Sequence, residues 1–248
     1  MRLITIPFSH FCEKARWGLD RARLAYTEQG YAPAVHRLAL VPRRSSTVPV
    51  LVDNGRTIRG SSEILRLCDA EGHAAAPVFP HDPAVRADVE ELVARFDRRL
   101  GPATRLWLYS WLVEDREQFL RYSALGLAPD QRRRFERALP IIMRVVRKGL
   151  GIRAGTREWA ANRADEELAF VAERLSDGRP FLAGDSFTAA DLTFAALSAA
   201  VIMPPGYGGG AISPPPAPPE VARQLEARRE TVAGRHAVAM YADWRVAA

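Results

Sequence analysis

The stretch Thr5-Ile-Pro-Phe-Ser-His-Phe-Cys-Glu-Lys-Ala-Arg-Trp17 decides how this chain is interpreted. A short apolar strand enters a turn that contains Ser9 and Cys12, and the turn leads directly into a helix. Such a turn directs backbone N–H groups and the positive end of a helix dipole at one small region. A thiolate in that region is stabilised, whether it belongs to the protein or to a bound thiol.

The first 75 residues alternate between strand and helix patterns. The predicted elements are a strand at 2–6, a helix at 12–23, a short strand within 26–35, strands at 47–52 and 56–59, and a helix at 61–70. Asp53-Asn54-Gly55 is a strong hairpin signal between the last two strands. Mixed strands and helices with a late hairpin predict a thioredoxin-like domain.

The rest of the chain has helical periodicity. An Ala- and Pro-rich stretch at 74–83 is typical of a linker, and apolar residues then recur at helical spacing. Residues 192–203 are apolar on nearly all sides, which predicts a central buried helix. The Pro- and Gly-rich stretch 204–219 is expected to be irregular, and 220–245 returns to a helical pattern. The predicted class is α+β, with a thioredoxin-like domain at 1–75, a linker at 76–83 and an all-helical domain at 84–248.

Composition restricts the possible ligands and compartments. The chain has 248 residues and a net charge of +6, which favours anionic ligands but does not by itself imply nucleic acid. The two cysteines, Cys12 and Cys68, fit neither a disulfide framework nor a zinc spacing, so no metal site is expected. The longest apolar run is too short for a bilayer, which needs about 20 residues. With no apolar signal segment, a cytoplasmic location is expected.

Three further motifs stand out; the first is structural, and the other two have both a structural and a functional interpretation. Thr188-Ala-Ala-Asp191 is a capping box that begins the central helix. Val48-Pro49 opens a strand: a cis bond would present the Val48 backbone to an extended peptide, whereas a trans proline would suit an edge strand. Gly60-Ser61-Ser62-Glu63 begins a helix, where hydroxyl and N–H groups either cap the helix or hold a carboxylate.

Taken together, these motifs resemble the cytosolic glutathione S-transferase superfamily, and in particular its serine-type, bacterial-like members. The resemblance covers nearly the whole chain. It rests on Pro7-Phe-Ser-His-Phe-Cys12, Thr47-Val-Pro-Val50, Gly60-Ser-Ser-Glu-Ile64 and Phe181-Leu-Ala-Gly-Asp-Ser-Phe-Thr-Ala-Ala-Asp191.

The resemblance implies roles for individual residues. Ser9 occupies the catalytic position, Val48 pairs through its backbone with the cysteinyl part of glutathione, and Pro49 is the cis proline. Ser61 holds the γ-glutamyl carboxylate, and His36 lies where a basic group could meet the glycyl carboxylate. The other residues expected at the glutathione site are Phe11, Gly60 and Ser62.

One position departs from the family pattern. The family usually has an acidic residue directly before the serine that holds the γ-glutamyl carboxylate, and this chain has Gly60 there. Glu63, or Asp97 from a partner subunit, could supply the missing acid.

The implied function is a transferase with glutathione as co-substrate and a role in detoxification. Ser9 would donate a hydrogen bond to the glutathione thiolate, which then attacks a small apolar electrophile. Aromatic residues of the helical domain could form the walls of the second pocket or belong to the core; they are Trp107, Tyr109, Trp111 and Phe119. A homodimer is expected from the resemblance, and no nucleic-acid or membrane partner is expected.

Two alternatives stay open. Cys12 could form a mixed disulfide with glutathione and act as a thiol-disulfide oxidoreductase. The chain could also be a non-catalytic binding protein, an interpretation that Gly60 favours.

Overall fold

A four-stranded mixed sheet forms the centre of the first domain. The computed structural model describes residues 1–72, 77–210 and 215–245. The strand order is β2-β1-β3-β4; β1 is parallel to β2, and β3 is antiparallel to both of its neighbours. The strands are β1 (Arg2–Thr5), β2 (Thr27–Gly30), β3 (Val50–Asp53) and β4 (Arg56–Arg59). Asn54 and Gly55 connect β3 to β4 with φ values of 43° and 82°, as the predicted tight hairpin requires.

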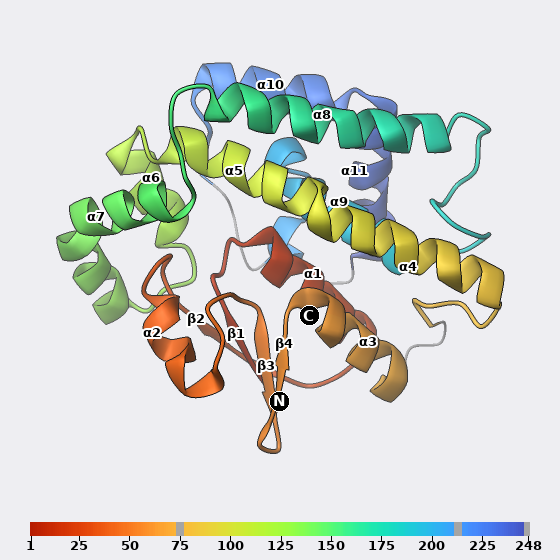
Figure 1. Ribbon diagram of the computed structural model, residues 1–248, viewed down its shortest axis with the longest axis horizontal. Coiled ribbons are helices and arrows are strands. Elements are labelled where there is room, and N and C mark those ends of the chain that lie inside the picture. Colours follow the sequence, from red (N-terminus) through yellow and green to blue (C-terminus); the bar gives the residue numbers. More distant parts are fainter. Residues whose placement is uncertain (73–76, 211–214, 246–248) are drawn as a thin grey trace.

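Helices cover both faces of this sheet, because successive side chains of a strand point to opposite faces. Leu3 and Leu51 pack with α1 and α3, whereas Ile4 and Val50 pack on the other face against Leu40 of α2. The helices are α1 (His10–Arg21), α2 (His36–Leu40), continued by the 3-10 turn η1 (Val41–Arg43), and α3 (Ser61–Glu71). Figure 1 shows α1 between the sheet and the second domain, and α3 beside α1 and β4. The predicted thioredoxin-like arrangement is confirmed.

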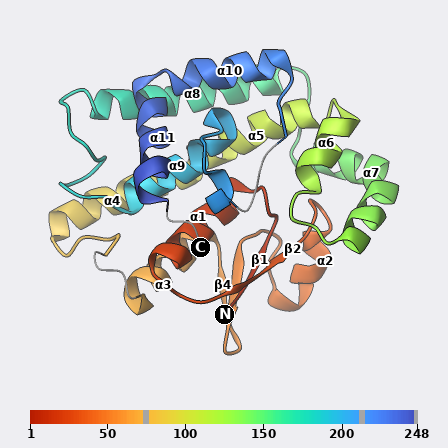
Figure 2. The ribbon, with the colours of Figure 1, turned by 180° about the vertical axis from the view of Figure 1, so that it is seen from behind.

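The second domain is helical, as predicted. Its described helices are α4 (Pro83–Arg98), α5 (Leu100–Leu112), α6 (Arg116–Ser123), α7 (Pro129–Gly149), α8 (Thr156–Arg174), α9 (Ala189–Ile202), α10 (Pro219–Arg229) and α11 (Val232–Trp244). Every residue of α9 is buried, which confirms the predicted central helix. Figure 2 shows α9 in the interior, with α11 and α5 beside it.

Three details differ from the predictions. The segment 220–245 forms two helices, because Thr231 begins a new one by accepting a hydrogen bond from Gly234 N. The segment expected to be irregular contains the 3-10 turn η2 (Tyr207–Gly210), and its residues 211–214 lie outside the described part of the chain. Pro83, placed in the linker, is the first residue of α4, since Asp82 caps that helix. Residues 73–76, where the predicted first domain meets the predicted linker, also lie outside the described residues.

The predicted capping box fixes the start of α9. Thr188 Oγ1 accepts a hydrogen bond from Ala190 N at 3.2 Å, and Asp191 accepts from Thr188 N at 3.0 Å. Asp191 is completely buried, and it also accepts from Leu182 N at 2.8 Å. His236 Nε2 lies 3.2 Å from the same carboxylate. The box therefore connects three parts of the helical domain as well as capping one helix.

Helix α1 joins the two domains. It packs against α9, and Trp17 Nε1 donates to Trp244 O at 3.1 Å. Arg245 is nearly inaccessible and donates to Glu13 and Asp20 of α1, each at 2.8 Å. These contacts hold the N-terminal turn of α1 at a fixed place beside the helical domain.

Candidate active site at the domain junction

A cleft opens where the N-terminus of α1 meets α5 and α7, and its cavity volume is about 140 Å³. We call it the junction cleft. The first domain lines it with Ile6, Phe8, Ser9, His10, Phe11, Pro33, Ala34, His36, Arg37, Ser46, Thr47 and Val48. The helical domain lines it with Arg105, Leu108, Tyr109, Val145, Val146, Gly149 and Leu150. The cleft therefore needs both domains.

Ser9 lies at the positive end of α1. It is the N-cap residue, with extended backbone angles, and its N–H donates to Ile6 O at 2.9 Å. Its side chain makes no capping hydrogen bond, although capping is the usual role of a serine at this position. The hydroxyl is half-buried in the junction cleft, beside first-turn N–H groups that have no partner within the helix. The helix dipole favours a negative charge here.

Cys12 is in a different environment from Ser9. Its side chain is completely buried, and it does not belong to the described lining of the junction cleft. Burial raises the pKa of the Cys12 thiol to about 11, although Arg16 and a hydrogen bond with Ser9 act in the opposite direction. The sulfur therefore keeps its proton at neutral pH. This position argues against Cys12 as a thiolate nucleophile, because only the thiolate is reactive.

The peptide bond between Val48 and Pro49 is cis, as one of the two interpretations of this motif required. Val48 lines the junction cleft together with Thr47. Pro49 lies behind it and accepts a hydrogen bond from Gly60 N at 3.0 Å. The cis proline therefore lies next to the start of α3, the other predicted binding element.

The start of α3 holds Gly60, Ser61 and Ser62. Gly60 is the N-cap residue with a φ of 86°, a left-handed conformation that favours glycine. Ser61 is buried in the first turn. In the described part of the chain, these three residues lie outside the lining of the junction cleft.

Ser62 belongs to a polar cluster with a buried lysine. Lys14 of α1 is completely buried, and its Nζ donates to Ser62 Oγ at 2.7 Å and to Asp97 Oδ1 at 2.8 Å. Ser62 Oγ also donates to Asp97. Asp97 is thus held inside its own subunit, which argues against its predicted use by a partner subunit. Glu63 is exposed and pairs with Arg66, so neither acid lies free to replace the residue missing at Gly60.

His36 and Phe11 line the junction cleft as expected. Burial lowers the pKa of His36 below its ordinary value, and the neighbouring Arg37 lowers it further. A neutral His36 is therefore expected at neutral pH, where it can form hydrogen bonds but carries no charge. Arg37, which also lines the cleft, is the cation on this wall, and the sequence analysis did not identify it.

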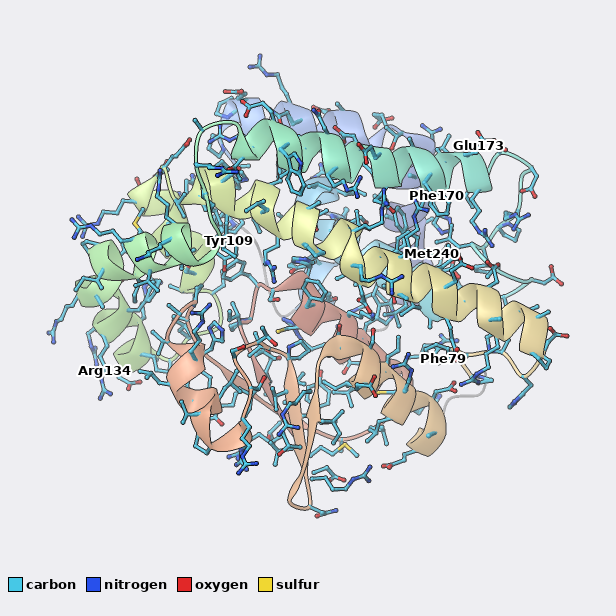
Figure 3. All side chains as sticks on the ribbon, viewed as in Figure 1. Phe79, Tyr109, Arg134, Phe170, Glu173 and Met240 are labelled. Atoms are coloured by element: carbon cyan, nitrogen blue, oxygen red, sulfur yellow. The ribbon has the colours of Figure 1, made fainter. Side chains whose placement is uncertain are left out.

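One of the four candidate wall aromatics reaches the junction cleft. Tyr109 lines it, and Figure 3 shows Tyr109 where α5 approaches α6 and α7. Trp107, Trp111 and Phe119 are buried in the core of the helical domain, which supports the second of the two interpretations for these three residues. These three side chains lie on the sides of α5 and α6 that face the core. Helical spacing in the sequence does not show which side of a helix faces the core and which faces a cleft.

Arg105 is the second cationic lining residue that the sequence analysis did not identify. It lies one helical turn before Tyr109 on the same wall. A signal existed in the sequence: Arg105 has no acidic residue three or four positions away, and apolar residues surround it in the chain.

Comparison with known proteins supports an assignment of the fold. Residues 3–74 match the family model of the glutathione S-transferase N-terminal domain. The whole chain has the glutathione S-transferase fold. A glutathione S-transferase from Xanthobacter autotrophicus Py2 is similar over 98% of this chain and 92% of its own, with a TM-score of 0.60 and 18% identity. No curated protein matches the sequence.

Other solved structures give the same result. A glutathione S-transferase from Rhodospirillum rubrum F11 is 22% identical over 98% of both chains, with a TM-score of 0.54. The beta-etherase LigF from Sphingobium sp. strain SYK-6 is 16% identical over 95% of this chain and 97% of its own, with a TM-score of 0.58. The family model therefore matches the N-terminal domain and the solved structures share the fold of the whole chain, and the serine-type, bacterial-like subtype stays a prediction.

The described residues contain neither a candidate membrane-spanning helix nor a candidate metal cluster. None of their helices is both long and apolar enough to cross a bilayer. Within the same residues, no group of three or more His, Cys, Asp and Glu side chains could hold a metal ion.

Proposed function

We propose that this chain is a glutathione transferase that joins the thiolate of glutathione to a small electrophile in the junction cleft. The main support is the position of Ser9, whose hydroxyl makes no capping hydrogen bond at the positive end of α1. The same cleft exposes Val48, next to the cis peptide bond. Glutathione would lie along Val48, with its sulfur at Ser9 and its γ-glutamyl carboxylate near Ser61.

The charge of the junction cleft agrees with this proposal. Among its described lining residues, two are arginines and none is an aspartate or glutamate. Glutathione carries two carboxylates, so a cleft without acidic side chains favours it. The helix dipole and a hydroxyl donor would together lower the pKa of the bound thiol, because both stabilise its charged form.

Ser9 would act as a hydrogen-bond donor and not as a nucleophile. A serine nucleophile needs a base that removes its proton, and burial lowers the pKa of the neighbouring His10 to about 3. His10 Nε2 also lies 3.0 Å from Gly101 O, with which it forms a hydrogen bond.

The reaction then follows from these roles. The thiol of glutathione loses its proton to solvent on binding, and the sulfur forms a bond to the electrophilic carbon of the second substrate. With a chlorinated aromatic substrate, the carbon–chlorine bond breaks and chloride leaves with the bonding electrons. With a conjugated enone, the carbon next to the carbonyl takes up a proton from water.

The test compares Ser9→Ala with two control variants. Loss of one hydrogen bond to a charged acceptor is worth about 1.5–3 kcal/mol, so Ser9→Ala should lower kcat/KM with 1-chloro-2,4-dinitrobenzene by about 10- to 100-fold. The pKa of bound glutathione, followed by its thiolate absorbance, should rise by about 1 to 2 units. Ser46→Ala, which also removes a hydroxyl from the cleft, and Cys12→Ala should have little effect.

Other results would point to the alternatives. Disulfide reduction that depends on Cys12 would support the oxidoreductase. Binding to immobilised glutathione without turnover would support a binding protein, and the absence of such binding would refute the proposal.

The homodimer expected from the resemblance stays a prediction, which sedimentation of the full chain would test.

A further inference from the structure

The inner wall of the junction cleft holds an arginine without an acidic partner. Arg105 of α5 forms no ion pair with any described residue, and its buried Nε makes no hydrogen bond there. Arg105 Cζ lies 5.9 Å from the centroid of the Phe11 ring. A guanidinium that is half-buried and unpaired in a cleft is costly, because it has lost water without gaining an anion.

From this we propose, on the basis of the function proposed above, that Arg105 binds an anionic group of the second substrate. The ligand would be an electrophile with an apolar body and one carboxylate or similar anion. A planar guanidinium forms two parallel hydrogen bonds with a carboxylate, and such pairs are stronger than neutral hydrogen bonds.

The side chains around Arg105 indicate the chemistry of the rest of this ligand. Leu108 and Tyr109 follow Arg105 on α5, and Val145 and Leu150 face the same cleft from α7 and its end. These side chains are apolar or aromatic, so they fit an aromatic or aliphatic body. The anion therefore would lie at the base of an apolar pocket, where its pairing with Arg105 is protected from water.

Arg105 is separate from the cation that would serve glutathione. Arg37 and His36 belong to α2, on the wall that also contains Thr47 and Val48. Arg105 belongs to α5, on the wall that the helical domain contributes. Two cations on two walls match two anionic ligands, with glutathione along the first domain and the electrophile against the helical domain.

Helix α7 adds a positive field at the mouth of the cleft. It contains seven Arg and Lys residues and two acidic residues, and its Val145 and Val146 line the cleft. Figures 1 and 2 both show α7 beside α2, and Figure 3 shows Arg134 on the outer side of α7. Such a concentration of one charge raises the local concentration of anionic ligands.

The experiment uses two electrophiles that differ in one charge. Ethacrynate has an enone and a carboxylate, and its methyl ester has the same enone without the charge. Arg105→Gln should lower kcat/KM for ethacrynate by about 10- to 100-fold and change the value for the ester by less than about 3-fold. Arg105→Lys should restore part of the loss. Arg133→Gln, which removes the same charge from the exposed face of α7, should leave the ratio of the two substrates unchanged.

A binding measurement separates this proposal from the function on which it rests. Titration calorimetry would follow the binding of dihydroethacrynate, in which the reactive double bond is reduced, to the full chain without glutathione. Loss of this binding in Arg105→Gln would support the anion site even if glutathione itself failed to bind. Equal binding by the wild type and Arg105→Gln would overturn it. An equal loss of activity with both substrates, together with a raised KM for glutathione, would also overturn it, since Arg105 would then bind glutathione.

Discussion

Acid should weaken this fold through His10, the first residue of α1. Its imidazole is almost completely buried, and Nε2 lies 3.0 Å from Gly101 O of α5. Burial lowers the pKa of His10 from 6.5 to about 3, and the nearby Arg105 contributes in the same direction, although the Gly101 hydrogen bond opposes both. The folded protein therefore keeps His10 neutral at a pH where the unfolded chain takes up a proton.

The sign and the size of the effect follow from proton linkage. Between about pH 3 and 6.5 the unfolded state binds more protons at this site, so the free energy of unfolding falls as the pH falls. A pH of about 5 lies about 1.5 units below the pKa of an exposed histidine. Each unit of this difference lowers the free energy of unfolding by about 1.4 kcal/mol. The protein should thus lose about 2 kcal/mol between about pH 7.5 and pH 5 through His10 alone.

Urea denaturation at these two pH values measures the effect. His10→Gln keeps an amide donor but does not titrate, so its loss of stability between the two pH values should be about 2 kcal/mol smaller than that of the wild type. His81→Gln removes an exposed histidine and serves as the control, with the same pH dependence as the wild type. Equal losses in the wild type and in His10→Gln would refute the argument.

Two further predictions concern stability. Asp191→Ala leaves the buried N–H groups of Leu182 and Thr188 without acceptors, so it should cost about 3–5 kcal/mol in urea unfolding, against about 1 kcal/mol for Thr188→Ala. Equal costs would contradict the cross-linking role of Asp191. Asp97→Asn leaves the buried Lys14 without its counter-ion and should cost about 3 kcal/mol, whereas the double variant Lys14→Met with Asp97→Leu should recover most of this loss. A double variant less stable than Asp97→Asn would show that the pair itself stabilises the fold.

Signals that act over a few residues were interpreted correctly from the sequence. The hairpin at Asp53-Asn54-Gly55 depends on the left-handed conformations that Asn and Gly adopt, and the helix start at Thr188 depends on a side chain three residues away. The ends of helices were less accurate, as Pro83 shows, because a Pro-rich stretch suits both a linker and a first helical turn.

Only part of the candidate site could be predicted from such local signals in the sequence. Ser9 and Val48 were found because each belongs to a motif with a local geometry. Cys12 is three residues from Ser9 and was the second candidate in the sequence, and α1 directs it into the interior. A separation of three residues places two side chains near each other on a helix, but only the packing of that helix decides which of them meets solvent.

The sequence by itself therefore determined the order of elements, the two kinds of domain and the turn that begins α1. The tertiary structure decided what faces the cleft: Arg105 and Tyr109 come from a helix about a hundred residues further along the chain, and Asp97 is held by Lys14. The reason is physical. Turns, caps and periodicity are set by contacts between near neighbours, whereas the cleft and its charge arise only when the two domains pack against each other.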